Sequence, residues 1–115
     1  MNLAHIDFEE LPRALIVRVK GEIDLSNVDD IRNEVTARVA SNIARVVLDL
    51  SATTYLDSSG IRLLFDLAER LQARRQQLAL VVTDQALVRR VILLTKLDDE
   101  VPLHTTVESA LGDLA

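Results

Sequence analysis

The residues best suited to chemistry stand at the end of the segment Leu48–Gly60, Leu-Asp-Leu-Ser-Ala-Thr-Thr-Tyr-Leu-Asp-Ser-Ser-Gly. An apolar run ends near Leu50, and an aspartate and two serines come directly before a segment with helical periodicity. A serine at a helix start can carry a phosphate, because exposed N–H groups and the helix dipole stabilise the added charge. The alternative is that Asp57 or Ser58 only caps the helix, while Gly60 permits close packing. With two serines, one can cap while the other stays exposed, so the segment is a good phosphoacceptor.

Other kinds of reactive site lack their motifs. The sequence has no cysteine, which excludes thiolate catalysis, iron–sulfur clusters and cysteine zinc sites. No serine lies within Gly-x-Ser-x-Gly, and the three glycines are isolated, without the Gly-Lys-Ser/Thr of a phosphate-binding loop. His5 and His104 are expected to be ordinary surface or edge-strand residues. We expect no enzymatic activity, no cofactor and no metal site. Direct nucleotide binding at a sheet edge is an alternative that nothing in the residues requires.

Composition and charge limit the class of protein. With 115 residues, of which 49% are hydrophobic, the chain has material for one core, and we expect a single domain over residues 1–115. The net charge of −5 disfavours binding to nucleic acid or to an anionic membrane surface. The first residues do not resemble a signal peptide, and no apolar run approaches the ~20 residues that span a bilayer. These features predict a cytoplasmic protein.

Short apolar runs predict the strands that would position the serines. Residues 14–20 alternate between apolar and charged side chains, which is typical of a half-buried strand. Residues 45–50 and 78–83 are nearly continuous apolar runs rich in β-branched residues, as in parallel sheets. A weaker strand is expected around Leu3 to Phe8, and residues 101–104 are expected to form an edge strand, because Pro102 cannot donate to an inner ladder.

Helical periods occupy the segments between these strands. A first helix is predicted from Asn27, with Ser26 as its N-cap, and further helices over about 58–75 and 84–97. A last short helix is indicated by Thr105-Thr-Val-Glu108, which has the pattern of a capping box. Alternating strands and helices predict an α/β fold with a mixed, mostly parallel sheet of four to five strands, covered by about four helices. Asp57 and Ser58 would then lie at the carboxyl edge of the sheet, where ligand contacts cluster in such folds.

The helix after the serines has an unusually wide apolar face. Its expected core stripe is widened by Leu63 and Leu67 to about 200°, while Arg62 lies on a narrow polar side. Such a face indicates either deep burial or an apolar rim left for a partner.

Two motifs resemble those of a known family. Gly21-Glu-Ile-Asp24, followed about thirty residues later by Asp49-Leu-Ser-Ala-Thr-Thr-Tyr-Leu-Asp-Ser-Ser-Gly-Ile61, resembles the STAS-domain anti-sigma-factor antagonists of bacteria. The resemblance covers almost the whole chain. It implies a small cytoplasmic protein that binds an anti-sigma factor, itself a serine kinase, and so releases a sigma factor. Phosphorylation by that kinase ends the interaction, and a serine phosphatase restores it.

The resemblance also implies roles for individual residues. The phosphoacceptor is the serine directly after the aspartate, Ser58, presented by Asp57 with Asp24 close by. The whole partner-binding set is expected to be Asp24, Asp57, Ser58, Ser59, Gly60, Arg62 and Leu63. Many members have Gly-Leu-Gly after the serines where this chain has Gly60-Ile61-Arg62, so Arg62 bears on partner choice. The family also contains non-switching accessory subunits that dock on transporter ATPases or signalling scaffolds, and this is the alternative function.

Overall fold

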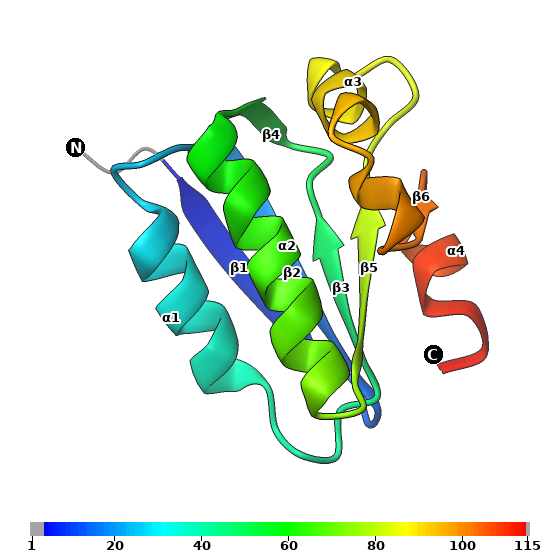
Figure 1. Cartoon of the computed structure of the whole chain (residues 1–115). Coiled ribbons are helices and arrows are strands. Elements are labelled where there is room, and N and C mark those ends of the chain that lie inside the picture. The colour runs from blue at the N-terminus through cyan, green and yellow to red at the C-terminus, as the bar shows by residue number, and fades with distance from the viewer. Residues whose placement is uncertain (1–3, 115) are drawn as a thin grey trace.

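The computed structural model describes residues 4–114 of the chain and shows six strands and four helices within them (Figure 1). The strands are β1 (His5–Glu10), β2 (Ala14–Ile23), β3 (Arg45–Asp49), β4 (Thr53–Leu56), β5 (Gln77–Val81) and β6 (Leu103–His104). The helices are α1 (Val28–Arg38), α2 (Ser58–Ala73), α3 (Leu87–Leu94) and α4 (Val107–Leu111), and two short 3-10 turns cover Leu97–Asp99 and Gly112–Leu114.

Five of the strands form one sheet in the order β1-β2-β3-β5-β6. β1 runs antiparallel to β2, and the other neighbours pair in parallel. The mixed, mostly parallel α/β sheet predicted from the sequence is therefore confirmed, with one strand more than expected. Since β2, β3 and β5 are parallel, the segments that follow them meet at one edge, called here the carboxyl edge.

The additional strand is β4, which pairs in parallel with the last residues of β2. The sequence predicts no strand here, because the four residues Thr-Thr-Tyr-Leu show no clear alternation of polar and apolar side chains. Its partner is an extension of β2 beyond Lys20, reached through an irregularity at Gly21, whose φ of 103° is readily adopted only by glycine. Thr53 fixes the pairing, since its hydroxyl donates to the carbonyl of Val19 at 2.8 Å.

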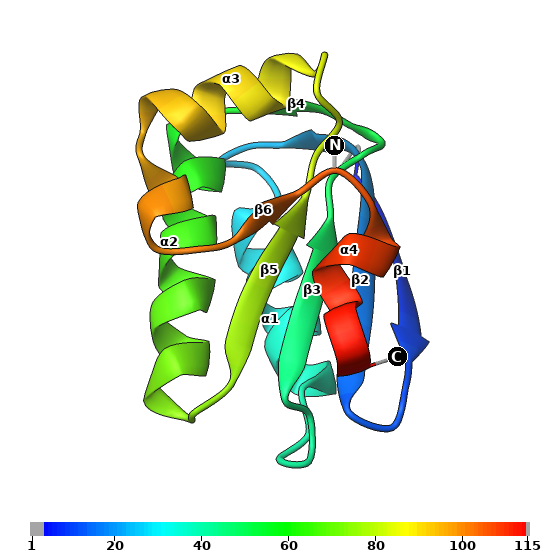
Figure 2. The same cartoon turned by 90° about the vertical axis from the view of Figure 1, so that its right-hand side faces the viewer.

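Side-chain alternation along the central strands divides the core into two layers. Leu15 and Val17 of β2 face the larger cluster, under α1, α2 and α3, whereas Ala14 and Ile16 face a smaller cluster under α4. Figure 2 shows α1 and α2 on one side of the sheet and α4 on the other. The guanidinium of Arg45 donates to the last carbonyls of α4 at 2.9 and 3.0 Å and so holds this helix on the sheet.

Several predicted boundaries need correction. The predicted start of the first strand, Leu3, lies outside the described residues, and β1 begins at His5. Ser26 is not the N-cap of α1. That position belongs to Asn27, a buried residue whose side chain binds the backbone of Glu22 and Asp24. In α4 the cap is Thr106, not Thr105, since the Thr106 hydroxyl accepts from the Ser109 amide.

The predicted third helix is shorter than expected and divided. α3 ends at Leu94, and Lys96, with a φ of 61°, separates it from the 3-10 turn. A left-handed residue cannot continue an α-helix, and the apolar period alone does not reveal it.

The wide apolar face of α2 is explained by deep burial. Leu63 and Leu67 are 1% and 2% exposed, because α2 packs on the sheet with α1 beside it. Asp66 joins the two helices by accepting from Arg32 at 3.1 Å, and it also accepts from Arg70 at 2.9 Å. A hydrogen bond to Asp29, with a further contribution from Asp66, raises the pKa of Arg32.

Candidate functional site

The candidate site lies at the carboxyl edge, where two parallel strands end side by side. Ile23, the last residue of β2, is in register with Leu56, the last residue of β4. The next residues, Asp24 and Asp57, therefore leave the sheet as neighbours, and the Asp57 amide donates to the Ile23 carbonyl at 3.3 Å. This pairing brings together the two motifs that are about thirty residues apart in the sequence.

The Asp57 carboxylate joins the start of α2 to the loop after β2. As the N-cap residue, it accepts from the Gly60 amide at 3.0 Å through Oδ1. Its Oδ2 accepts from the Leu25 amide at 3.2 Å. Because both oxygens are engaged, Asp57 serves as a structural link between two loops as well as a helix cap.

Asp24 organises its own loop. Its Oδ1 accepts from the amide and hydroxyl of Ser26 at 2.9 and 2.5 Å, and its amide donates to the Asn27 side chain at 3.0 Å. Asp24 therefore acts as a turn residue before α1. Asp24 also lines a shallow groove together with Asp57, the residue that precedes α2.

The three residues after Asp57 differ in exposure. Ser58 is the first residue of α2 and is exposed, Ser59 is half-buried and Gly60 is buried. A Cβ atom at Gly60 would lie 3.1 Å from Leu56 Cγ and 3.2 Å from Ile23 Cγ2, so glycine is needed for the close approach of α2. Since Asp57 caps the helix, Ser58 is left as an exposed residue without a capping role.

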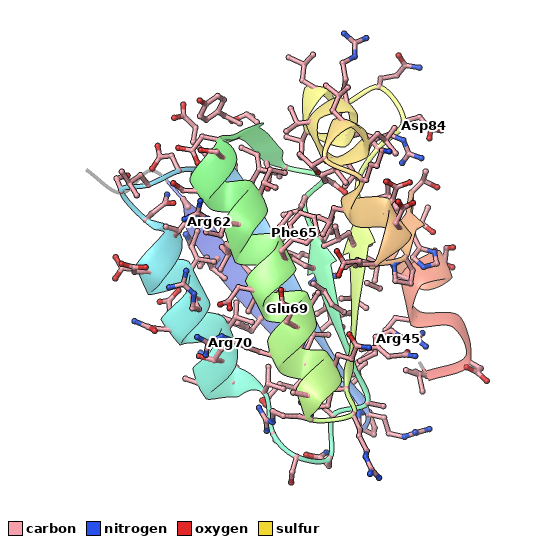
Figure 3. The ribbon with its side chains drawn as sticks, viewed as in Figure 1. Arg45, Arg62, Phe65, Glu69, Arg70 and Asp84 are labelled. Atoms are coloured by element: carbon pink, nitrogen blue, oxygen red, sulfur yellow. The ribbon has the colours of Figure 1, made fainter. Side chains whose placement is uncertain are left out.

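The remaining predicted residues lie one turn further along α2. Arg62 is exposed, and Figure 3 shows it on the side of α2 nearer to α1. Leu63, by contrast, is 1% exposed within the larger core cluster. The prediction that Leu63 contributes to the partner surface is therefore corrected, because a fully buried side chain offers no area for contact.

Two further residues, Leu25 and Tyr55, belong to this site and were not predicted from the sequence. Their side chains are 77% and 51% exposed, and they line the groove with Asp24, Ser26 and Asp57. Leu25 could have been recognised as an apolar residue within the turn sequence Asp-Leu-Ser, before the helical periodicity of α1 begins. For Tyr55 there was no such signal, because its exposure depends on the unrecognised strand β4.

Two kinds of feature were looked for within residues 4–114, a cluster of metal-ligating side chains and a helix that could span a membrane. No group of three or more His, Asp or Glu side chains within residues 4–114 could hold a metal ion. Over the same residues, no helix combines the length and the apolar character required to cross a membrane.

The fold and the Asp-Ser-Ser-Gly junction define a class of protein. The chain belongs to the STAS domain family, whose sequence model matches residues 5–110. Among curated proteins, the anti-sigma-F factor antagonist RsfA of Mycobacterium tuberculosis is 33% identical over 101 residues, which cover 86% of this chain and 78% of RsfA. This similarity confirms the predicted resemblance to STAS-domain anti-sigma-factor antagonists.

Solved structures give the same result. An anti-sigma factor antagonist from Mycobacterium paratuberculosis superimposes with a TM-score of 0.83 at 32% identity, over 94% of this chain and 91% of that one. The anti-sigma factor antagonist SpoIIAA in its unphosphorylated form has a TM-score of 0.76 at 21% identity, over 96% of both chains. The phosphorylated form of SpoIIAA from Bacillus has a TM-score of 0.70 at 18% identity, over 96% of this chain and all of that one. The SpoIIAA structures show a shared fold.

Proposed function

We propose that this protein is a phosphorylation-controlled anti-sigma-factor antagonist of the cytoplasm. In its unphosphorylated form it binds an anti-sigma factor that is a serine kinase, and so releases a sigma factor. The kinase phosphorylates Ser58, which ends the interaction, and a serine phosphatase removes the phosphate. The protein itself catalyses no reaction and needs no cofactor.

The observation that carries this proposal is the separation of roles at the start of α2. Asp57 performs the capping, with its two oxygens on the amides of Gly60 and Leu25. Ser58 is exposed and has no capping duty, so its hydroxyl is accessible to the active site of a kinase. This arrangement supports the proposal, because capping by the aspartate leaves the serine available for modification.

The local charges explain how one phosphate would end the interaction. A phosphate adds about −1.5 to −2 charges and three acceptor oxygens. At the first turn of α2 it lies near unpaired N–H groups and the positive end of the helix dipole, so the fold tolerates it. Toward a partner, however, it stands beside Asp57 and Asp24, and this concentration of negative charge must be desolvated when the complex closes. The phosphate therefore acts at the interface and leaves the fold intact.

The proposed contact surface consists of Ser58 and the residues around it, of which Ser58 and Arg62 are exposed and Asp24, Asp57 and Ser59 are partly exposed. Asp24, Asp57 and Ser59 surround the phosphoacceptor, and Gly60 contributes by its small size and backbone position. Arg62, one turn away, supplies a positive charge to the same helix end. A glycine or other uncharged residue at this position would change the charge that a partner meets, so Arg62 is proposed as a determinant of partner choice.

Phosphate mapping tests the function directly. The full chain is incubated with ATP and the serine-kinase anti-sigma factors of the same organism, and the modified residue is located by mass spectrometry. We expect one phosphate on Ser58 in the wild-type protein, none in Ser58→Ala, and one on Ser58 in the matched control Ser59→Ala. Phosphate on Ser59 would contradict the assignment of the switch. No phosphate with any of these kinases would favour the non-switching accessory subunit.

A further inference from the structure

The exposed large hydrophobic side chains within residues 4–114 share one end of the molecule. They are Leu25, Tyr55, Leu87, Leu93 and Leu94. Leu25 follows β2, Tyr55 lies in β4 beside the end of β2, and the three leucines lie in α3, which follows β5. Because β2 and β5 point in the same direction in the sheet, the segments that carry these five residues all lie at the carboxyl edge, where Figure 1 shows β4 and α3.

Helix α3 has an apolar face on each side. Val88 and Ile92 are 3% and 0% exposed and hold the helix on the core. Leu87 and Leu94, in contrast, are 72% and 76% exposed. Seven residues are about two helical turns, so these two leucines lie on the same outward face. Such exposed apolar area is unfavourable in water and is typical of interaction sites.

The outward face also carries positive charge. Arg90 is exposed and lies between Leu87 and Leu94, on the same side of the helix. The neighbouring Arg89 is partly engaged by the fold, since it donates to the Val82 carbonyl at 3.3 Å and faces Asp84 at 3.9 Å. No acidic residue occurs between Leu87 and Leu94, although the whole chain has a charge of −5. An apolar partner surface with an acidic rim would therefore be complementary to this face.

The face is continuous with the site around Ser58. α3 packs against β4, the strand that carries Tyr55. Tyr55 in turn lines the groove formed with Leu25 and Asp57, the residue that precedes Ser58. The carboxyl edge thus presents one surface with two parts, an acidic part around Ser58 and an apolar, positively charged part on α3.

We infer that the outward face of α3, formed by Leu87, Arg90 and Leu94, is a second docking area for the anti-sigma factor kinase, and that it binds an apolar surface with acidic residues on that protein. The inference rests on the proposed function and names a further part of its interface. A second copy of this chain is a poorer occupant, because two-fold pairing of the face would bring the two Arg90 side chains together.

The two parts of the surface differ in their response to phosphate. The charge on Ser58 opposes binding at the acidic part, while α3 lies on the other side of β4 and keeps its apolar contacts. α3 therefore contributes to the affinity of the unphosphorylated protein and to recognition of the protein as a kinase substrate, independently of the switch.

The test uses the full chain and the kinase that phosphorylates Ser58. Dissociation constants are measured calorimetrically for the wild type, Leu87→Ala/Leu94→Ala and Arg90→Glu. Arg74→Glu is the matched control, because Arg74 is also exposed but lies at the opposite edge, after the end of α2.

We expect the Kd to rise about tenfold or more for both α3 variants. The Kd of Arg74→Glu should stay within about twofold of the wild type, as is usual for a charge outside an interface. The thermal midpoint of all variants should stay that of the wild type, because the changed side chains are exposed.

Other outcomes separate this inference from the proposed function. Wild-type binding with unchanged Kd in both α3 variants would overturn the inference alone. A wild-type dimer in sedimentation that the α3 variants dissociate, with kinase affinity unchanged, would assign the face to a second copy and also overturn it. No binding of any kinase by the wild type would overturn the proposed function and this inference with it.

Discussion

At the scale of single residues, the site depends on which side chain satisfies which backbone group. A helix start leaves several N–H groups unpaired, and the side chain of either Asp57 or Ser58 could have accepted a hydrogen bond from one of them. The structure gives this role to Asp57, which accepts from both Gly60 and Leu25. The account of the switch follows from this assignment, because a serine engaged in capping would be less available to a kinase.

Gly60→Ala tests the packing beneath the site. Gly60 is buried, and an added Cβ would meet the side chains of Leu56 and Ile23. We expect a loss of about 1–3 kcal/mol in the free energy of unfolding, as for other overpacked cores, measured by urea denaturation. Ser59→Ala, at the neighbouring position, is the control and should cost less. Unchanged stability of Gly60→Ala would show that α2 does not approach the sheet as closely as described.

The residue types at the site could be predicted from the sequence, but their surroundings could not. An aspartate and two serines before a helical period indicate a cap and a phosphoacceptor by local chemistry alone. The bond from Leu25 to Asp57 spans 32 residues and depends on the pairing of β2 with β4. A local sequence pattern cannot reveal a contact between residues so far apart. The exposure of Tyr55 was not predicted for the same reason, because it depends on the pairing of β4 with β2.

At the scale of elements, α2 shows how an apolar stripe can mislead. The width of its apolar face was compatible with either deep burial or a partner surface. The burial of Leu63 beside α1 shows that deep burial is the explanation. Periodicity describes which residues share a face of a helix, whereas the number of neighbours around the helix is a tertiary property. The same limit applies to β4, which is too short to be recognised without its partner strand.

Leu63→Ala tests the burial of α2. Removal of a fully buried leucine side chain should cost about 2–5 kcal/mol of the free energy of unfolding. Affinity for the anti-sigma factor kinase should be unchanged at a temperature where the variant is folded. The control is Arg62→Glu, an exposed neighbour, which should reduce affinity while leaving stability close to that of the wild type. Reduced affinity of folded Leu63→Ala would instead return Leu63 to the interface.

At the scale of the whole molecule, the sheet holds the two parts of the carboxyl edge in fixed positions. Its central strands face a core layer on each side, which the continuous apolar runs of β3 and β5 predicted in outline. The loops that carry function are attached to the ends of these rigid strands, so a single phosphate can alter the surface without altering the frame.

Val47→Asp tests this frame. Val47 is 0% exposed in β3, between the sheet and α4. A carboxylate there would be buried without a partner, so the variant should be unfolded or severely destabilised, with a strongly lowered thermal midpoint. Thr54→Asp, an exposed position in β4, is the matched control and should melt near the wild type. A wild-type midpoint for Val47→Asp would contradict the assignment of β3 to the interior.

The most direct test of the central claim is the affinity of the kinase for the unphosphorylated and the Ser58-phosphorylated chain, measured by titration, with circular dichroism of both forms. We expect phosphate on Ser58 to raise the Kd by at least about thirtyfold, or about 2 kcal/mol, while the spectrum and the cooperative thermal transition are retained. Ser58→Ala should bind like the unphosphorylated wild type, and Ser58→Asp should bind more weakly than Ser58→Ala. Equal affinity of the two forms, or loss of the fold on phosphorylation, would contradict a switch that acts by charge at the interface.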